Sequence, residues 1–229
     1  MTSFCRSENP MTLPILYSLQ NCPYAMRARL AILLAQQTVE LRAIVMKNKP
    51  AEMLALSPKG TVPVLVLESE DKTIVIDESL DIMMWALKLN DPQNLLYSQN
   101  EQALAEMLQI INENDHQFKP ELEQYKRARR FHSNDEEHCR RQCEPFIQQL
   151  EFRLTQHEFL MGPTLSLLDY ALLPFIRQFS RVNRQLYLQG PYTHLQNWLN
   201  HHLQSRLFSK AMIKYPLWLD NYEICILGE

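Results

Sequence analysis

Apolar residues along the first ninety positions switch between the short spacing of strands and the longer spacing of helices. Residues 13–18 (LPILYS) form a short apolar run and residues 39–46 (VELRAIVM) a β-branched one, and each predicts a strand. Between them, residues 24–36 carry apolar side chains such as Met26 and Leu30 at helical spacing. This segment therefore predicts a strand, a helix and a second strand.

The next segment predicts a short helix, a hairpin and a longer helix. Residues 50–56 (PAEMLAL) have a helical pattern and lead into the turn SPKGTVP at 57–63. Two apolar runs at 64–69 and 73–77 flank a short polar connection, which is typical of a hairpin. Residues 79–89 return to helical spacing. The order βαβ, helix, ββ, helix predicts a small mixed sheet with helices on both faces.

The rest of the chain has only helical patterns after a linker at 90–98. No convincing strand follows the linker, and no internal repeat is visible. We therefore expect an α/β domain at 12–90 and an all-helical domain at 99–229, preceded by a polar tail at 1–10. The helical patterns occupy residues 99–129, 135–157, 167–183 and 192–212.

A capping box is predicted in the second domain. Ser166 stands three residues before Asp169, directly ahead of an apolar run. In this motif the hydroxyl accepts from a free amide of the first turn and the carboxylate reaches back to the cap. We interpret it as a folding signal and not as a site.

Composition and charge narrow the function classes. The chain has 229 residues, 46% of them hydrophobic, and a net charge of −3, so it lacks the basic excess of a nucleic-acid-binding protein. Apolar runs such as 30–35 are too short to cross a membrane, and the first residues have no secretory signal pattern. The five cysteines are odd in number and scattered, which favours a reduced, cytoplasmic protein without a disulfide framework.

Cys22 is the candidate nucleophile. Pro23 suits the first position of a helix, so Cys22 is expected at the N-cap, facing free amides and the positive end of the helix dipole. This position favours a thiolate, and Arg27 and Arg29 are expected to add positive potential. Position 25 is alanine, where a dithiol oxidoreductase has its second cysteine, so an external thiol must release whatever bonds to Cys22.

Two further motifs predict a site for a peptide-like ligand. The Val62–Pro63 bond before a strand is a candidate cis peptide, which would leave the backbone of Val62 free to pair with an extended ligand. Ser79 opens the next helix and offers a carboxylate site, while Glu78 offers a partner for an ammonium. The α-carboxylate and α-ammonium of one amino acid would satisfy both.

Other residues compete for a chemical role. A hydroxyl of Tyr17 or Ser18, near the end of the first strand, could stabilise a thiolate on a bound ligand, although an inward-packing tyrosine is the simpler interpretation. His132, His138, Cys139 and Cys143 do not have a known zinc spacing. The two cysteines share a helical apolar stripe and are expected in the core, and no metal is expected.

The chain resembles a cytosolic glutathione transferase over nearly its whole length after residue 12, and the omega class most of all. That family has a thioredoxin-like first domain and a helical second domain. Each motif alone is weak, but five occur in the family's order and spacing. They are CPYAMRARL (22–30), KNKP (47–50), SPKGTVPVL (57–65), DESL (77–80) and FLMGPTLSLLDY (159–170).

The resemblance implies roles for individual residues. By position, Cys22 would form a mixed disulfide with glutathione, Lys49 would pair with the glycyl carboxylate, and Val62 would hold the cysteinyl backbone. Glu78 and Ser79 would hold the γ-glutamyl end. The candidate glutathione site is completed by Tyr24 and Pro63.

The activity that follows is glutathione-dependent thiol transfer, with glutathione as co-substrate and a mixed disulfide or dehydroascorbate as the second substrate. A homodimer is implied by the family alone. Conjugation of glutathione to electrophiles through Tyr17 or Ser18 is the alternative enzyme activity, and a non-catalytic interaction protein resembling the stringent starvation protein is the non-enzyme alternative. Candidates for selecting the second substrate are Tyr125, Phe175, Phe179 and Trp218.

Overall fold

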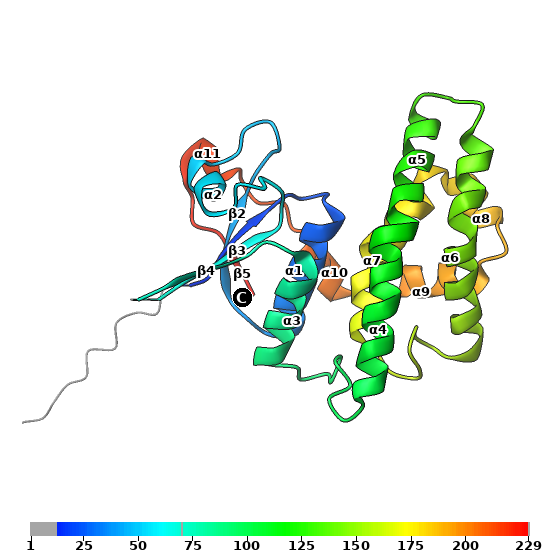
Figure 1. Ribbon diagram of the computed structural model, residues 1–229, viewed down its shortest axis with the longest axis horizontal. Helices are drawn as coiled ribbons and strands as arrows, with labels where there is room; N and C mark the ends of the chain where they lie inside the picture. The colour runs from blue at the N-terminus through cyan, green and yellow to red at the C-terminus, as the bar shows by residue number, and fades with distance from the viewer. Residues whose placement is uncertain (1–12, 70, 229) are drawn as a thin grey trace, which may run out of the picture.

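A computed structural model describes residues 13–69 and 71–228. The predicted polar tail and Cys5 lie outside these residues. Figure 1 shows two parts side by side, a small sheet with its helices and a bundle of longer helices. The predicted architecture of a thioredoxin-like domain followed by a helical domain is confirmed.

The first domain is built on a mixed five-stranded sheet of order β4-β3-β1-β2-β5. The two central strands, β1 and β2, run parallel, and all other neighbours are antiparallel. The four strands expected from the sequence therefore form in the expected order. The strands are β1 (Ile15–Ser18), β2 (Val39–Ala43), β3 (Val64–Glu68), β4 (Thr73–Ile76) and β5 (Ile226–Leu227).

Both faces of this sheet are covered. Strand alternation sends neighbouring side chains of β1 to opposite faces. Leu16 joins the large core that includes residues of α1 (Pro23–Leu34) and α3 (Ser79–Leu89). Tyr17 joins a smaller cluster with Met53 of α2 (Ala51–Leu56) on the other face.

The second domain is helical, but its first helix is not regular. The sequence predicts one helix over 99–129, whereas the structure has α4 (Glu101–Glu113), a π-helical turn η1 (Asn114–Phe118) and then α5 (Lys119–Arg130). The remaining helices are α6 (Glu136–Gln156), α7 (Leu167–Val182), α8 (Arg184–Gln189), α9 (Thr193–Leu203), α10 (Arg206–Ala211) and α11 (Trp218–Asn221).

The predicted capping box is confirmed at the start of α7. Ser166 and Asp169 bond reciprocally, with both side chains fully buried. Asp169 also accepts from the backbone amide of Leu160 at 3.0 Å and from Trp198 Nε1 at 2.8 Å. The carboxylate thus ties α7 to the preceding loop and to α9.

The C-terminal segment returns to the first domain, so the expectation of no strand after the linker is wrong. Its strand β5 pairs with β2 and forms the edge of the sheet, and Leu41 N donates to Cys225 O at 2.7 Å. The short helix α11 lies beside α2 in Figure 1. There, Trp218 Nε1 donates to Glu52 at 2.8 Å.

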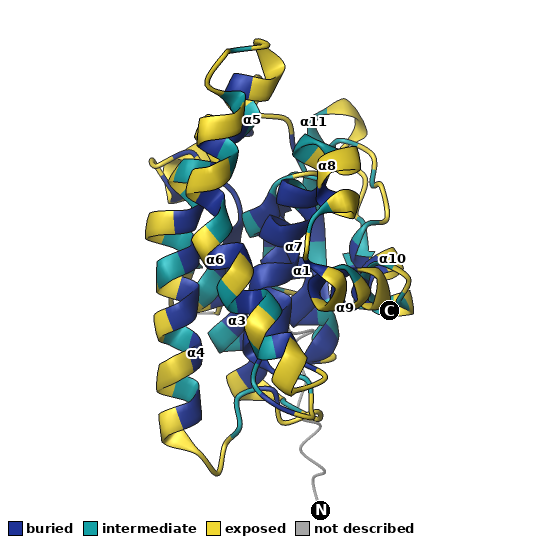
Figure 2. Ribbon diagram, turned by 90° about the vertical axis from the view of Figure 1, so that its right-hand side faces the viewer, coloured by how far each residue is buried: buried dark blue, intermediate teal, exposed yellow. Residues whose placement is uncertain are grey.

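The two domains pack together through α1 and α7. Arg27 is fully buried and bridges them, because its Nε donates to Ala171 O at 2.7 Å and its two terminal nitrogens bind both oxygens of Asp115. Arg27 therefore does not add free positive potential near Cys22, since its charge is paired with Asp115. In Figure 2 the buried faces of α1 and α7 lie at the centre of the molecule. No helix among the described residues is long and apolar enough to cross a membrane.

Candidate functional site

Cys22 stands at the N-cap of α1, as predicted, with extended backbone angles and with Pro23 at the first helical position. Its half-buried thiol donates to Val62 O at 3.7 Å and makes no bond to the first-turn amides. Those amides point towards the cap and suit a negatively charged sulfur. The thiol therefore stands at the positive end of the α1 dipole.

Arg29 supplies a cation close to this position. Its guanidinium is buried and donates to Leu19 O and Gln20 O, both in the turn that leads to Cys22. Burial lowers the pKa of Arg29 to about 10, and the proximity of Cys22 acts in the opposite direction. Of the two arginines expected to act on the thiol, Arg29 lies beside it and Arg27 does not.

A cavity of about 330 Å³ lies between the first domain and η1 of the second. Cys22 is not one of its lining residues, but the Cys22 thiol contacts the carbonyl of Val62, which is. The volume of the cavity falls in the range of small-molecule sites, about 300–1,000 Å³. Val62 is among its lining residues, and the peptide bond between Val62 and Pro63 is cis, as predicted. The cavity is lined by Tyr24, Lys59, Thr61, Val62, Pro63, Asp77, Glu78, Ser79, Asp115 and His116.

Glu78 and Ser79 lie at one end of this cavity, at the start of α3. Glu78 is the N-cap residue and Ser79 is the first helical residue. The cap therefore lies one position earlier than Ser79, where the sequence analysis expected it. Ser79 is buried, whereas the carboxylate of Glu78 is 64% exposed and forms an ion pair with Lys59. This contact raises the pKa of Lys59. The cavity thus holds a carboxylate and an ammonium group side by side.

Lys49 does not line the cavity, although the family resemblance implies that it binds the glycyl carboxylate of glutathione. Its Nζ lies beside Gly60, where a Cβ atom would stand only 3.2 Å from it. Gly60 has φ +63° and two residues separate it from Pro63. Lys49 therefore lies next to the loop that carries Val62, at the edge of the candidate site.

Tyr24 and the second domain form the opposite wall. The Tyr24 ring contacts Phe175 of α7 edge-on, with centroids 5.2 Å apart. Burial raises the pKa of Tyr24, and the nearby carboxylate of Asp115 adds to this effect. The pairing of Arg27 with Asp115 fixes η1 against α1, so the wall is held by a buried contact between the domains.

The rival hydroxyls are engaged elsewhere. Tyr17 is buried, its hydroxyl accepts from Arg42 Nη1 at 2.9 Å, and burial raises its pKa. Ser18 Oγ is buried and accepts from Arg29. Neither residue is among those that line the cavity.

The four aromatic residues considered for selecting a second substrate have structural contacts. Phe175 and Phe179 are buried in the core, and Tyr125 is buried with a pKa raised to about 12 by desolvation. Trp218 packs against Arg42, whose guanidinium carbon lies 4.1 Å from the ring centre. None of the four lines the cavity near Cys22.

The cysteines of α6 are core residues, as predicted. Cys139 and Cys143 are both buried, and burial raises the pKa of Cys143 to about 12. Among the described residues, no group of three or more histidines, cysteines and acidic residues is arranged to hold a metal.

Sequence reasoning missed five polar residues of the cavity, namely Lys59, Thr61, Asp77, Asp115 and His116. Lys59 stands in the quoted turn SPKG, but its ion pair with Glu78 depends on how that turn folds over α3. Asp115 and His116 come from the π-helical turn of the second domain. Their segment, NENDHQF, has only the polarity of an exposed helix face, so no local signal indicates the cavity.

Comparisons with known proteins agree with this geometry. Residues 16–94 match the family model "Glutathione S-transferase, N-terminal domain", and residues 101–201 match "Glutathione S-transferase, C-terminal domain". A search of curated proteins finds no match. The two models together span most of the chain and follow one another in the order that the family requires.

Solved structures share the fold at low sequence identity. A glutathione transferase family member from Pseudomonas fluorescens, with two glutathione bound, has a TM-score of 0.76 at 17% identity and covers 90% of this chain and 95% of its own. Glutathione transferase Omega 2C from Trametes versicolor has a TM-score of 0.72 at 20% sequence identity, and the match covers 90% of this chain and 94% of that one. FzlA from C. crescentus has a TM-score of 0.73 at 19% sequence identity, and the match again covers 90% of this chain and 94% of that one. Together with the family models, the fold shows that the chain belongs to the glutathione S-transferase family.

Proposed function

We propose that the protein is a glutathione-dependent thiol transferase that reduces mixed disulfides through a covalent intermediate on Cys22. The observation that carries the proposal is the place of the Cys22 thiol, at the N-cap of α1 and 3.7 Å from the carbonyl of Val62 in the cavity wall. A hydroxyl at the end of β1 would favour conjugation instead. The hydroxyls of Tyr17 and Ser18 both accept from arginines, whereas the Cys22 thiol contacts Val62 of the cavity wall.

The cavity offers partners for each part of glutathione. The γ-glutamyl end would lie at the start of α3, with its ammonium on Glu78 and its carboxylate at Ser79 and the first-turn amides. The backbone of Val62 would pair with the cysteinyl residue, and Pro63 and Tyr24 would flank it. Lys49 would reach the glycyl carboxylate from beyond Gly60.

The reaction would proceed in two thiol exchanges. The Cys22 thiolate attacks the glutathione sulfur of a mixed disulfide, the sulfur–sulfur bond breaks, and the second thiol leaves as a thiolate that takes a proton from water. A free glutathione thiolate then attacks the glutathione sulfur on Cys22. Oxidised glutathione leaves and the Cys22 thiolate is restored. Reduction of dehydroascorbate would use the same two thiols.

Four broader features belong to the same proposal. The motifs CPYA and KNKP support an omega-like class. A cytoplasmic setting suits free thiols, since four described cysteines are unpaired. A homodimer, and domain limits at 12–90 and 99–229, follow from the resemblance and the sequence pattern.

The test is the rate of reduction of a glutathione–mercaptoethanol mixed disulfide. We expect Cys22→Ser to lower this rate by about two orders of magnitude or more, because serine is not ionised near neutral pH. Calorimetric binding of S-methylglutathione should persist, because the peptide part is held by other residues. Cys225→Ser changes another half-buried free cysteine and is the matched control.

Mass spectrometry after treatment with oxidised glutathione should find one glutathione on Cys22 that a reductant removes. A Cys22→Ser variant that keeps its disulfide reductase rate would contradict the proposal. A rise in conjugation of an aryl halide by that variant would favour the conjugating activity. Binding of glutathione without activity on any thiol or electrophile would favour an interaction protein.

A further inference from the structure

A second cavity, of about 280 Å³, lies between the C-terminal halves of α5 and α7. Four of its six lining residues are cationic at neutral pH, and none of them carries a carboxylate. This is unusual in a chain whose net charge is −3. The lining residues are Lys126, Arg129, Arg130, Gln178, Arg181 and Val182.

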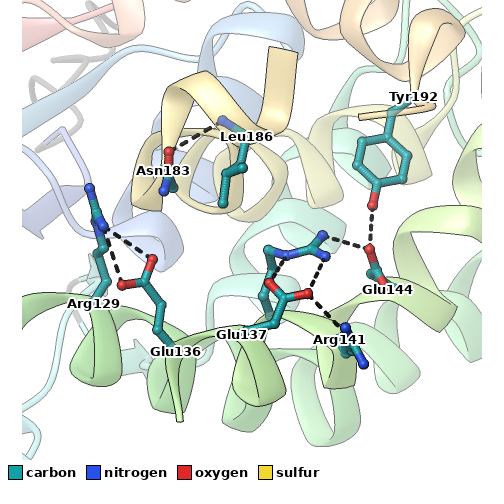
Figure 3. Close-up of polar contacts among 9 residues, drawn as sticks. Arg129, Glu136, Glu137, Arg141, Glu144, Asn183, Leu186 and Tyr192 are labelled. Atoms are coloured by element: carbon teal, nitrogen blue, oxygen red, sulfur yellow. Dashed lines mark hydrogen bonds and ion pairs between the residues drawn. The ribbon is translucent and has the colours of Figure 1, made fainter. Parts of the chain in front are cut away.

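The positive charge of this cavity is only partly neutralised. Lys126 pairs with Glu123, but the same carboxylate also pairs with Lys119. Figure 3 shows Arg129 directed at Glu136, at 3.2 and 3.3 Å from its two oxygens. Arg130 and Arg181 have no ion pair with any described residue.

A buried arginine beside the cavity adds to its positive charge. Arg177 is 8% exposed and its Nε has no hydrogen-bond partner among the described residues. Burial lowers the pKa of Arg177, and the repulsion from Arg181 lowers it further. An anion placed near Arg181 would relieve the repulsion between these two arginines.

The cavity lies on the side of the second domain that faces Cys22. On α7, Ala171 accepts from Arg27 of the first domain and Phe175 contacts Tyr24. Gln178 and Val182 follow at helical spacing on the same face. Val182 is two turns beyond Phe175, which is about 10 Å along the axis. A molecule with its sulfur at Cys22 could reach this cavity with an extended arm.

From this placement, we propose that the cavity binds an anionic group on the second substrate of the thiol transfer. The inference rests on the proposed function and adds the substrate class, namely a thiol or disulfide that carries a carboxylate or sulfonate on an arm long enough to pass Phe175 and reach Val182, about 10 Å further along α7. Val182 and the methylene stems of the arginines suit an apolar arm between sulfur and anion. Arg130 and Arg181 are the selecting residues because neither forms an ion pair within the described part of the chain.

The experiment compares two unreactive conjugates that differ only in a terminal charge. S-(7-carboxyheptyl)glutathione and S-octylglutathione are titrated calorimetrically into the protein and into the double variant Arg130→Gln/Arg181→Gln. We expect the native protein to prefer the carboxylate by about fivefold at low salt, and the double variant to lose this preference. The preference should also shrink at high ionic strength.

The matched control is the double variant Arg127→Gln/Arg184→Gln. It removes two exposed arginines from α5 and the start of α8 that do not line the cavity. The control should keep the preference for the carboxylate. Equal affinity of the native protein for both conjugates, or loss of the preference in the control as well, would overturn the inference while leaving the glutathione site intact.

A separate arm keeps the two proposals distinguishable. Failure of both conjugates to bind would contradict the proposed glutathione site. In that case 8-anilinonaphthalene-1-sulfonate, an apolar anion that needs no glutathione site, tests the cavity alone by fluorescence. Weaker binding in Arg130→Gln/Arg181→Gln but not in the control would support an anion cavity, and equal binding in all three proteins would refute it.

Discussion

At the scale of single residues, the site is a set of charges that are already paired in the absence of ligand. Glu78 is held by Lys59, and Asp115 by Arg27. The two pairs differ in burial, because Arg27 is fully buried whereas both members of the Lys59 pair are substantially exposed. An exposed pair is worth about 0–1 kcal/mol and can open for a ligand, whereas removing one partner of a buried pair costs about 3–5 kcal/mol.

Glu78→Ala should therefore weaken glutathione binding more than it weakens the fold. The loss of a charge-assisted contact to the ligand ammonium is worth about 1.5–3 kcal/mol, or roughly ten- to a hundredfold in affinity. Calorimetry with S-methylglutathione and urea unfolding would measure the two effects. Asp81→Ala removes an exposed carboxylate from the first turn of the same helix and is the control. Unchanged affinity of Glu78→Ala would place Glu78 outside the site.

His202 makes the stability of the second domain dependent on pH. Its ring is 2% exposed and packs edge-on against Trp198, and burial, with a further contribution from His201, lowers its pKa to about 3. Above about pH 6.5, His202 is neutral whether folded or unfolded. Below that pH only the unfolded chain binds the proton, so stability should fall by up to about 1.4 kcal/mol per pH unit until about pH 3.

The variant His202→Phe should show a flatter decline in the free energy of unfolding between pH 6.5 and pH 4. Urea unfolding at several pH values would measure it. His157→Gln, at an exposed position in the same domain, should keep the native slope. The assignment of the pH dependence to His202 fails if His202→Phe and the native protein lose stability in parallel.

At the scale of elements, local sequence signals predicted those parts of the fold that local interactions build. Pro23 and Cys22 predicted the start of α1, and two apolar runs on either side of a polar connection predicted the hairpin of β3 and β4. The π-helical turn was missed because a single residue added to a helix leaves its polar pattern almost unchanged. That turn carries Asp115 and His116 into the cavity, so the contribution of the second domain to the cavity wall could not be predicted.

The capping box of α7 should be the element whose loss costs most. Asp169 is fully buried and accepts from Ser166, Leu160 and Trp198, so Asp169→Ala leaves several buried donors without a partner. We expect a loss of about 3–5 kcal/mol in the free energy of unfolding by urea. Asp135→Ala changes an exposed N-cap residue of α6 that makes no capping bond, and it should cost less than about 0.5 kcal/mol. Similar losses in the two variants would contradict this role.

At the scale of the whole molecule, the features that the sequence did not predict depend on contacts between residues far apart in sequence. Arg27 was expected to act on Cys22 because the two are neighbours on α1, but Asp115 lies 88 positions away and takes its charge. Strand β5 has only two residues and is a strand only because β2 is beside it. The helical domain and the C-terminal segment thus each complete part of the first domain.

The attachment of this C-terminal segment depends on Gly228. Its φ is +110°, and a Cβ atom would stand 2.1 Å from the carbonyl oxygen of Gln37, so Gly228→Ala must move the end of β5 away from β2. Such a strained position costs about 1–3 kcal/mol, which would speed local opening by roughly five- to a hundredfold. The amide of Leu41, which donates to Cys225 O, should then exchange its hydrogen faster.

Hydrogen exchange measured by NMR would report this opening at Leu41 and, for comparison, at Leu16 in the centre of the sheet. Gly162→Ala is the control, because a Cβ atom there meets nothing within 4 Å. Faster exchange at Leu41 alone would show that β5 opens as a separate unit. Faster exchange at both amides would show that the whole sheet depends on β5. Unchanged exchange at both amides would contradict the role of Gly228, because a strand whose end is displaced by a steric clash cannot protect its neighbour as before.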